Sequence, residues 1–140
     1  MMNRTRDWPE RMHEAIEAAR ERPFRWGEHD CALFACGVVL AMTGTDLAGE
    51  FRGLYGSGEE AERIVSDSGG LKALCGSVAA RFGLAEIPRA YARRGDVVLV
   101  PAGPGGSLAL AICDGRFALS TQESGLVAVP MASAVKAWRV

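Results

Sequence analysis

The sequence is poor in the residues that metal sites and proton-transfer sites most often use. It has two histidines, His13 and His29, and none after position 29. Its four cysteines form no Cys-x-x-Cys pair, so it lacks the familiar spacing of zinc and redox motifs. No apolar run approaches the roughly 20 residues of a membrane-spanning helix, and the first residues lack the apolar core of a signal peptide. We therefore expect no metal, no disulfide framework and no membrane insertion, in a chain that works in or assembles from the cytoplasm.

The charge of the chain is nearly balanced. Sixteen basic and seventeen acidic residues leave a formal net charge of −1. This balance gives no electrostatic footprint for nucleic acid or for an anionic membrane surface, so neither partner is expected. A length of 140 residues suits one ordinary domain with one core, and no linker, repeat or low-complexity tract divides it. We expect a single domain over residues 1–140, without a cofactor.

The first half of the chain, about residues 7–83, has helical patterns. Asp7 and Glu10 form a capping-box pattern around Pro9, which predicts an amphipathic helix that ends before Pro23. The side chains expected on its core-facing side are Trp8, Met12, Ile16 and Ala19.

Two shorter helices are expected after a glycine-rich loop over residues 45–58. The apolar side chains of the loop either contact a partner or pin the loop to the core, and they are Phe51, Leu54 and Tyr55. Ser57 or Gly58 is placed to cap the first helix, and Gly70 precedes the second. The second helix is predicted to bury one face, formed by Leu71, Leu74, Cys75, Val78 and Phe82.

A cysteine lies at the start of another predicted helix, in the segment PFRWGEHDCALFACGVVLAMTG over residues 23–44. Trp26-Gly27 indicates a turn, His29 or Asp30 can cap the helix, and Gly44 is placed to end it. Cys31 then falls in the first turn, where unpaired N–H groups and the helix dipole favour a thiolate. The alternative is that Cys31 is a small apolar residue packed under the turn.

The second part, about residues 95–140, has the texture of β-structure. Gly95-Asp96 leads into VVLVP, an uninterrupted apolar run typical of a strand buried on both faces. LALAIC and RFALS flank Asp114-Gly115, a hairpin signal, and LVAVP predicts a further strand. The final AVKAWRV is a strand or a short helix. Helices followed by an antiparallel meander indicate the α+β class, with the N-terminal helices packed on a small antiparallel sheet.

These residues carry a resemblance to a known family. PFRWGEHDCALFACGVVLAMTG, followed by RRGDVVLVP, GSLALAICDGRFALS and GLVAVP, resembles the papain-like, NlpC-type cell-wall peptidases. In that family an aromatic-Gly turn leads to Asp-Cys at a helix start, and a later strand opens with histidine. The whole chain is also similar to small uncharacterised proteins found among the tail genes of phages and prophages. The resemblance implies a papain-like fold and a site near the Asp-Cys pair.

The family chemistry needs a thiolate, a facing imidazole and a polar residue that orients the ring. The resemblance places Cys31 at the nucleophile, Ser107 at the position of the histidine, and Leu119 or Ser120 at the third position. Serine cannot act as a general base near neutral pH. The general base is therefore missing from its expected place.

Four other residues are considered as replacements for the missing general base. His29 could reach the Cys31 sulfur only by folding back over the helix start, and otherwise it caps the helix or bonds nearby backbone. His13 is expected at the surface of the first helix. Asp30 is expected to cap its helix, and Asp96 to form the turn before its strand.

Three functions follow as hypotheses. The first is a structural or adaptor component of a phage or phage-like tail, in the hub or tip, built on a degenerate cysteine-peptidase fold and catalytically inactive. Its partners would be other tail proteins, and its location the virion tail. The second is a cysteine peptidase or amidase that acts on peptidoglycan during DNA entry, with Cys31 as nucleophile and His29 or a partner's residue as base. The third is an unrelated globular protein with the same α+β layout.

Overall fold

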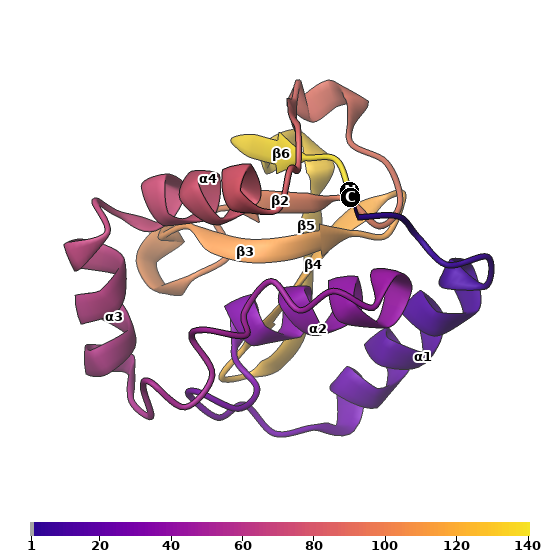
Figure 1. Ribbon diagram of the computed structural model, residues 1–140. Coiled ribbons are helices and arrows are strands. Elements are labelled where there is room, and N and C mark those ends of the chain that lie inside the picture. The colour runs from indigo at the N-terminus through magenta and orange to yellow at the C-terminus, as the bar shows by residue number, and fades with distance from the viewer. Residues whose placement is uncertain (1) are drawn as a thin grey trace.

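The computed structural model describes residues 2–140. Four helices form the first part of the chain: α1 (Trp8–Glu21), α2 (Cys31–Thr43), α3 (Gly58–Asp67) and α4 (Leu71–Arg81). Six strands follow: β1 (Glu86–Ile87), β2 (Val97–Val100), β3 (Ala109–Cys113), β4 (Phe117–Gln122), β5 (Gly125–Pro130) and β6 (Lys136–Trp138). Helices followed by an antiparallel sheet confirm the α+β class (Figure 1). Within residues 2–140, no helix combines the length and the apolar character needed to cross a membrane.

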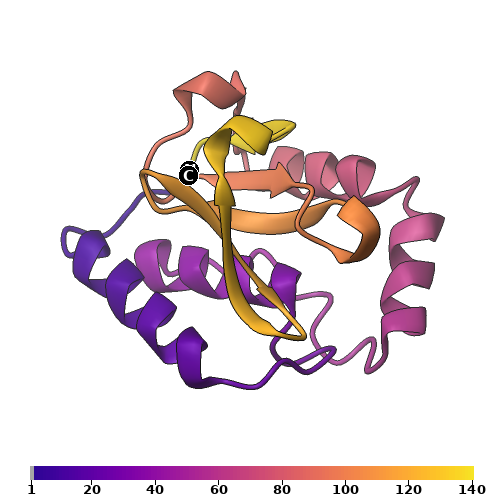
Figure 2. The same cartoon turned by 180° about the vertical axis from the view of Figure 1, so that it is seen from behind.

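The strands form one antiparallel sheet in the order β1-β6-β2-β3-β4-β5. Strands β2 to β5 run as the expected meander, and β4 and β5 form a long hairpin that passes in front of α2 in the view of Figure 2. The end of the chain is a strand, not a helix, because β6 returns to pair with β2 in the register Val97↔Trp138 and Leu99↔Lys136. The short β1 extends the sheet beyond β6.

Strand β2 is buried on both faces, as its uninterrupted apolar sequence predicts. Val97 and Leu99 belong to the larger core cluster, which includes residues of α1 and α2. Val98 and Val100 belong to a second cluster on the opposite face, with Ala111 as a neighbour. Successive residues of a strand point to opposite faces, so a strand covered on both sides needs apolar residues at every position.

Helix α2 lies between α1 and the sheet (Figures 1 and 2). On α1, the predicted core residues Met12, Ile16 and Ala19 are buried, whereas Trp8, predicted on the same face, is only partly buried against the core. The capping box predicted at Asp7 is wrong: its carboxylate caps no backbone N–H group and accepts a hydrogen bond from Arg11 Nε at 2.9 Å. A charged donor one turn away competes with the backbone for the same oxygen.

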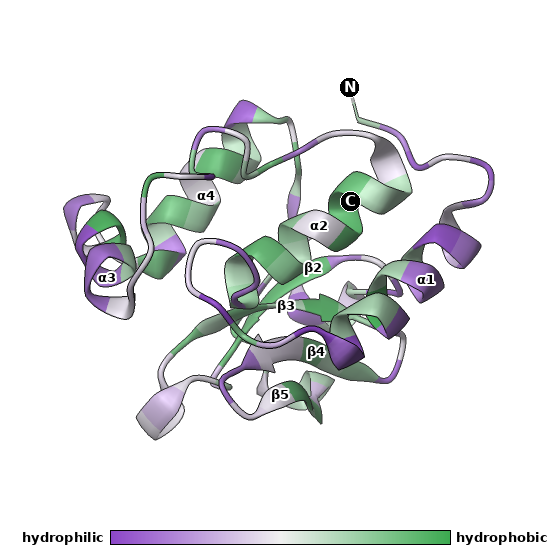
Figure 3. Ribbon diagram, turned by 90° about the horizontal axis from the view of Figure 1, so that it is seen from below, coloured by the Kyte–Doolittle hydropathy of each residue, from purple (hydrophilic) through white to green (hydrophobic). Residues whose placement is uncertain are grey.

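Helices α3 and α4 form the end of the molecule farthest from α1 (Figure 3). Ser57, rather than Gly58, caps α3 through a bond from Glu60 N at 3.1 Å. The predicted burial of one α4 face is only partly correct, because Ala79 alone is fully buried. The predicted face is half-buried, and it comprises Leu71, Leu74, Cys75, Val78 and Phe82. Helical periodicity identified the apolar face of α4 but not how completely it is covered.

Asp96 joins the two ends of the chain. It is fully buried before β2, and its carboxylate accepts hydrogen bonds from Arg4 Nη2 and Arg139 Nε, both at 3.1 Å. The backbone N–H groups of Arg93 and Val140 add bonds of 3.0 Å each. The residue predicted to form a turn therefore also fixes both termini to the sheet.

Candidate functional site

The turn before α2 is held by one buried carboxylate. Asp30 accepts hydrogen bonds from Leu33 N at 3.0 Å, from Gly27 N at 3.0 Å and from the Tyr55 hydroxyl at 2.6 Å. Asp30, not His29, is therefore the cap of α2. Gly27 has a φ of +78°, and a Cβ at this position would lie 2.1 Å from the Tyr55 carbonyl oxygen. Only glycine allows the turn to approach Tyr55 so closely.

Residues 45–57 cross from α2 to α3, and we call this segment the strap. Tyr55 pins the strap to the α2 turn through Asp30, and burial next to that carboxylate raises the pKa of Tyr55. Phe51 also turns inward and lines a cavity, whereas Leu54 is 62% exposed. Of the three apolar residues noted in this loop, two therefore fasten it and one remains free at the surface.

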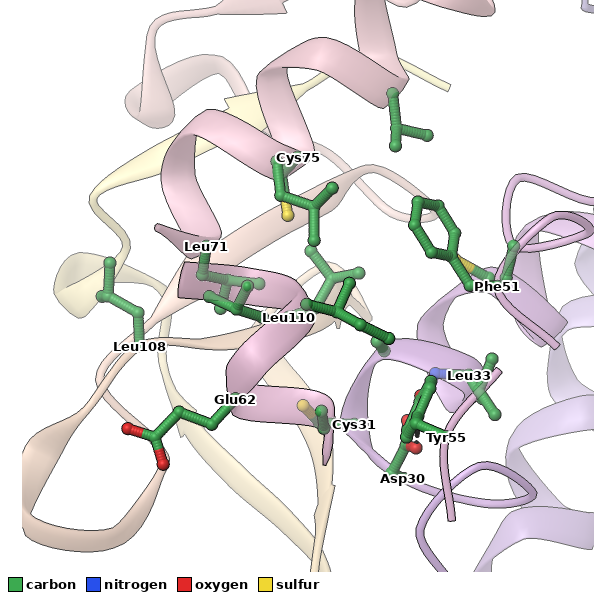
Figure 4. A pocket seen from close by; sticks show the side chains of 18 of the residues that line it. Asp30, Cys31, Leu33, Phe51, Tyr55, Glu62, Leu71, Cys75, Leu108 and Leu110 are labelled. Atoms are coloured by element: carbon green, nitrogen blue, oxygen red, sulfur yellow. Dashed lines mark hydrogen bonds between the residues drawn. The ribbon is translucent and has the colours of Figure 1, made fainter. Parts of the chain in front are cut away.

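The cavity that Phe51 lines has a volume of about 880 Å³ and opens beside the first turn of α2. Its walls come from α2, the strap, α3, α4 and strands β2 and β3 (Figure 4). Cys31, Tyr55, Cys75 and Leu110 are among the side chains that surround it. Its size lies in the upper part of the range of about 300–1,000 Å³ found for ligand pockets.

Cys31 lies in the first turn of α2 and lines this cavity, as the sequence predicts. Its pKa is not lowered as expected. Burial raises it, and the nearby Asp30 carboxylate raises it further, while the backbone N–H groups of Leu110 and of the first helical turn oppose this change. The free energy needed to remove a thiolate from water exceeds the stabilisation that the helix N-terminus provides, so the protonated thiol is favoured.

His29 lies away from the cavity. The residue is 4% exposed, its Nε2 is 3.4 Å from the Thr121 hydroxyl oxygen, and its ring packs edge-on against Phe34. Burial and the charge of Arg22 lower its pKa, against weaker effects of the Ala19 carbonyl and Asp30. The structure therefore places His29 between α1, α2 and β4, and does not bring it together with Cys31.

The positions that the sequence resemblance assigned to a histidine and an orienting residue, Ser107 and Leu119 or Ser120, hold no proton acceptor suited to Cys31. Ser107 is exposed at the rim of the cavity, two residues before β3 begins. Leu119 is buried in the core, and the Ser120 hydroxyl donates to the Leu110 carbonyl at 3.0 Å. Ser120 therefore supports the packing of β4 on β3.

The remaining candidates lie elsewhere. His13 is exposed on α1, and within residues 2–140 no three His, Cys, Asp or Glu side chains are grouped so that they could hold a metal ion. Sequence reasoning missed the Asp30–Tyr55 contact and the acidic residues Glu62 and Glu123 at the cavity. The Asp30–Tyr55 contact was foreshadowed by an aromatic residue in a glycine-rich loop. No local sequence pattern indicates that α3 and the β4–β5 turn border the same opening.

The site is thus a cysteine-containing apolar cavity of an α+β domain. Residues 3–140 match the model of a protein family described as a domain of unknown function, DUF6950. The chain belongs to this family. No match was found among curated proteins.

Proposed function

We propose that this chain is a non-catalytic structural or adaptor component of a phage or phage-like tail, in the hub or tip, built on a papain-like fold that lacks a general base. One observation carries the proposal: Cys31 lines the cavity, whereas His29 is buried on another side of α2. The tail assignment, and with it a location in the virion tail, is supported by the resemblance of the sequence to phage tail-associated proteins.

A cysteine hydrolase needs a group that accepts the thiol proton and returns it to the leaving amine. General acid–base catalysis contributes about 10²- to 10⁴-fold to the reaction rate. Because the residues of a catalytic unit act together, removing one of them lowers the rate by more than that. A carboxylate is a poor substitute. At ordinary pKa values, proton transfer from a thiol to a carboxylate is uphill by about 4 pK units, or about 6 kcal/mol.

The cavity supports holding rather than cutting. Its wall is fixed by the Asp30–Tyr55 bond, and its interior is largely apolar. Such a site can bind a partner without a reactive group. In this proposal, Cys31 is one of the small side chains that shape the interior.

The test is a pair of measurements on the purified full chain. We expect no soluble fragments from peptidoglycan after long incubation, with or without Cys31→Ala, and stoichiometric association with co-expressed tail proteins from the same gene cluster. Hydrolysis over many turnovers that Cys31→Ala abolishes would overturn the proposal and support the cell-wall peptidase or amidase. An inert protein that joins no tail assembly would reject the adaptor role.

A further inference from the structure

The cavity beside Cys31 is bordered by charges of one sign. Glu59 and Glu62 of α3 and Glu123 of the β4–β5 turn line it, and all three are exposed. Within residues 2–140, none of these three carboxylates forms an ion pair or accepts a hydrogen bond, and no lysine, arginine or histidine lines the cavity. The opening therefore presents unneutralised negative charge around an apolar interior.

Helix α3 contributes an apolar face that no other part of residues 2–140 fully covers. Ala61, Ile64 and Val65 line the cavity, and α3 has no buried residue. Helices of this length depend on packing of their apolar face, because their intrinsic stability is marginal in water. Leu71 and Leu74 of α4 line the same cavity and are also only half-buried. A ligand seated between these helices and β3 would complete their packing.

We propose that this cavity binds a positively charged, amphipathic peptide segment of a partner protein. Its large apolar side chains would lie between α3, α4 and Leu110 of β3, and its lysine or arginine side chains would face Glu59, Glu62 and Glu123. This inference rests on the proposed holding function and specifies the chemistry of what is held. Apolar anchors in a groove, with charged residues at its rim, are a common mode of peptide recognition.

The charges decide against other occupants of an apolar cavity. A fatty acid or phospholipid would place its anionic head group near three carboxylates, which costs free energy. A nucleic acid would meet the same repulsion. A cationic segment gains from each carboxylate, and a neutral apolar segment gains only from burial.

The experiment uses peptides that differ only in charge. Three synthetic peptides of about 14 residues carry leucine at the same helical positions and lysine, glutamine or glutamate at all others. Octanoate serves as the lipid-like probe. Binding to the full chain is measured by calorimetry, and by the fluorescence of Trp26 and Trp138, which both line the cavity. We expect the lysine peptide to bind most tightly, the glutamine peptide more weakly, and the glutamate peptide and octanoate least.

Matched variants locate the binding. Glu62→Gln combined with Glu123→Gln should lower the affinity for the lysine peptide by about two- to thirtyfold, as expected for the loss of two exposed ion pairs. The same variant should make the affinity less dependent on salt concentration. The control combines Glu10→Gln with Glu14→Gln, which are exposed on α1 and lie outside the cavity lining, and it should bind as the parent does. Ile64→Ser should lower the affinity for both the lysine peptide and the glutamine peptide. Circular dichroism confirms that each variant is folded.

The results separate the alternatives. Equal or tighter binding of octanoate or of the glutamate peptide would overturn the proposal, as would a lysine peptide unaffected by the cavity variants. A concentration-dependent dimer that Ile64→Ser abolishes would assign the cavity to a second copy instead. If no peptide binds but the protein stays inert and joins tail assemblies, only the occupant is wrong. If the protein hydrolyses peptidoglycan, the holding function fails whatever the peptides do.

Discussion

The reactivity of Cys31 as a function of pH tests the proposal that this thiol has no catalytic partner. Burial and the Asp30 carboxylate raise the pKa of this thiol above its ordinary value near 9. At pH 7 such a thiol is at most about 1% thiolate. A peptidase cysteine paired with an imidazolium has a pKa of about 4 and is almost fully ionised at the same pH. The two cases therefore differ at least about 100-fold in thiolate population.

The assay is alkylation of the natural protein by iodoacetamide between pH 5 and pH 10, followed at Cys31 by peptide mapping. The rate should rise about tenfold per pH unit up to at least pH 9, because only the thiolate reacts. The same protein unfolded in urea should react faster at pH 7, since unfolding removes the burial that disfavours the thiolate. A rate that levels off below pH 7 would refute the reasoning and indicate a charge partner for Cys31.

Three further predictions concern the groups that hold the fold. Asp96→Asn should lower the free energy of unfolding by about 3–5 kcal/mol, because it breaks a buried ion-pair cluster; Asp7→Asn, at an exposed pair, should leave the urea midpoint unchanged. His29 has a lowered pKa when folded, so the unfolded chain binds more protons below about pH 6.5, and stability should fall from there towards pH 5; His29→Gln should flatten this slope and His13→Gln should not. Tyr55→Phe should cost about 1.5–3 kcal/mol, measured by urea unfolding, because it removes a hydrogen bond to a buried carboxylate.

The parts of the fold that local sequence determines were predictable. The Asp30 cap at the start of α2 and the left-handed Gly44 at its end are both local features, since each depends only on residues within about one turn of it. The burial of β2 on both faces follows from four consecutive apolar residues. The β3–β4 hairpin is present as expected, although its two central residues are Gly115 and Arg116 rather than Asp114 and Gly115, since Asp114 N donates to Phe117 O. The exact residues at which such a turn begins and ends depend on the register of the two paired strands, which the local sequence does not determine to within one residue.

The candidate site was less predictable, because it depends on what covers each residue. His29 and Cys31 are two positions apart, yet the His29 ring packs near Thr121 whereas the Cys31 side chain lines the cavity. The helix terminus predicts a lowered pKa for Cys31, but desolvation is a tertiary effect and outweighs it. Similarly, the spacing of Leu71 and Leu74 identifies an apolar face without indicating that a cavity lies against it.

The contact that fastens the strap over the cavity also disfavours ionisation of Cys31. Asp30 caps α2 and receives the Tyr55 hydroxyl, so the position of the strap depends on a buried negative charge. The same charge lies next to Cys31 and disfavours its thiolate. A nucleophile would need a positive group at this place, and none of the residues that line the cavity is basic. The negative charge that would favour the proposed cationic segment at the rim has the same sign as the charge that keeps the thiol protonated, so the two proposals, holding such a segment and not cutting it, rest on the same electrostatics.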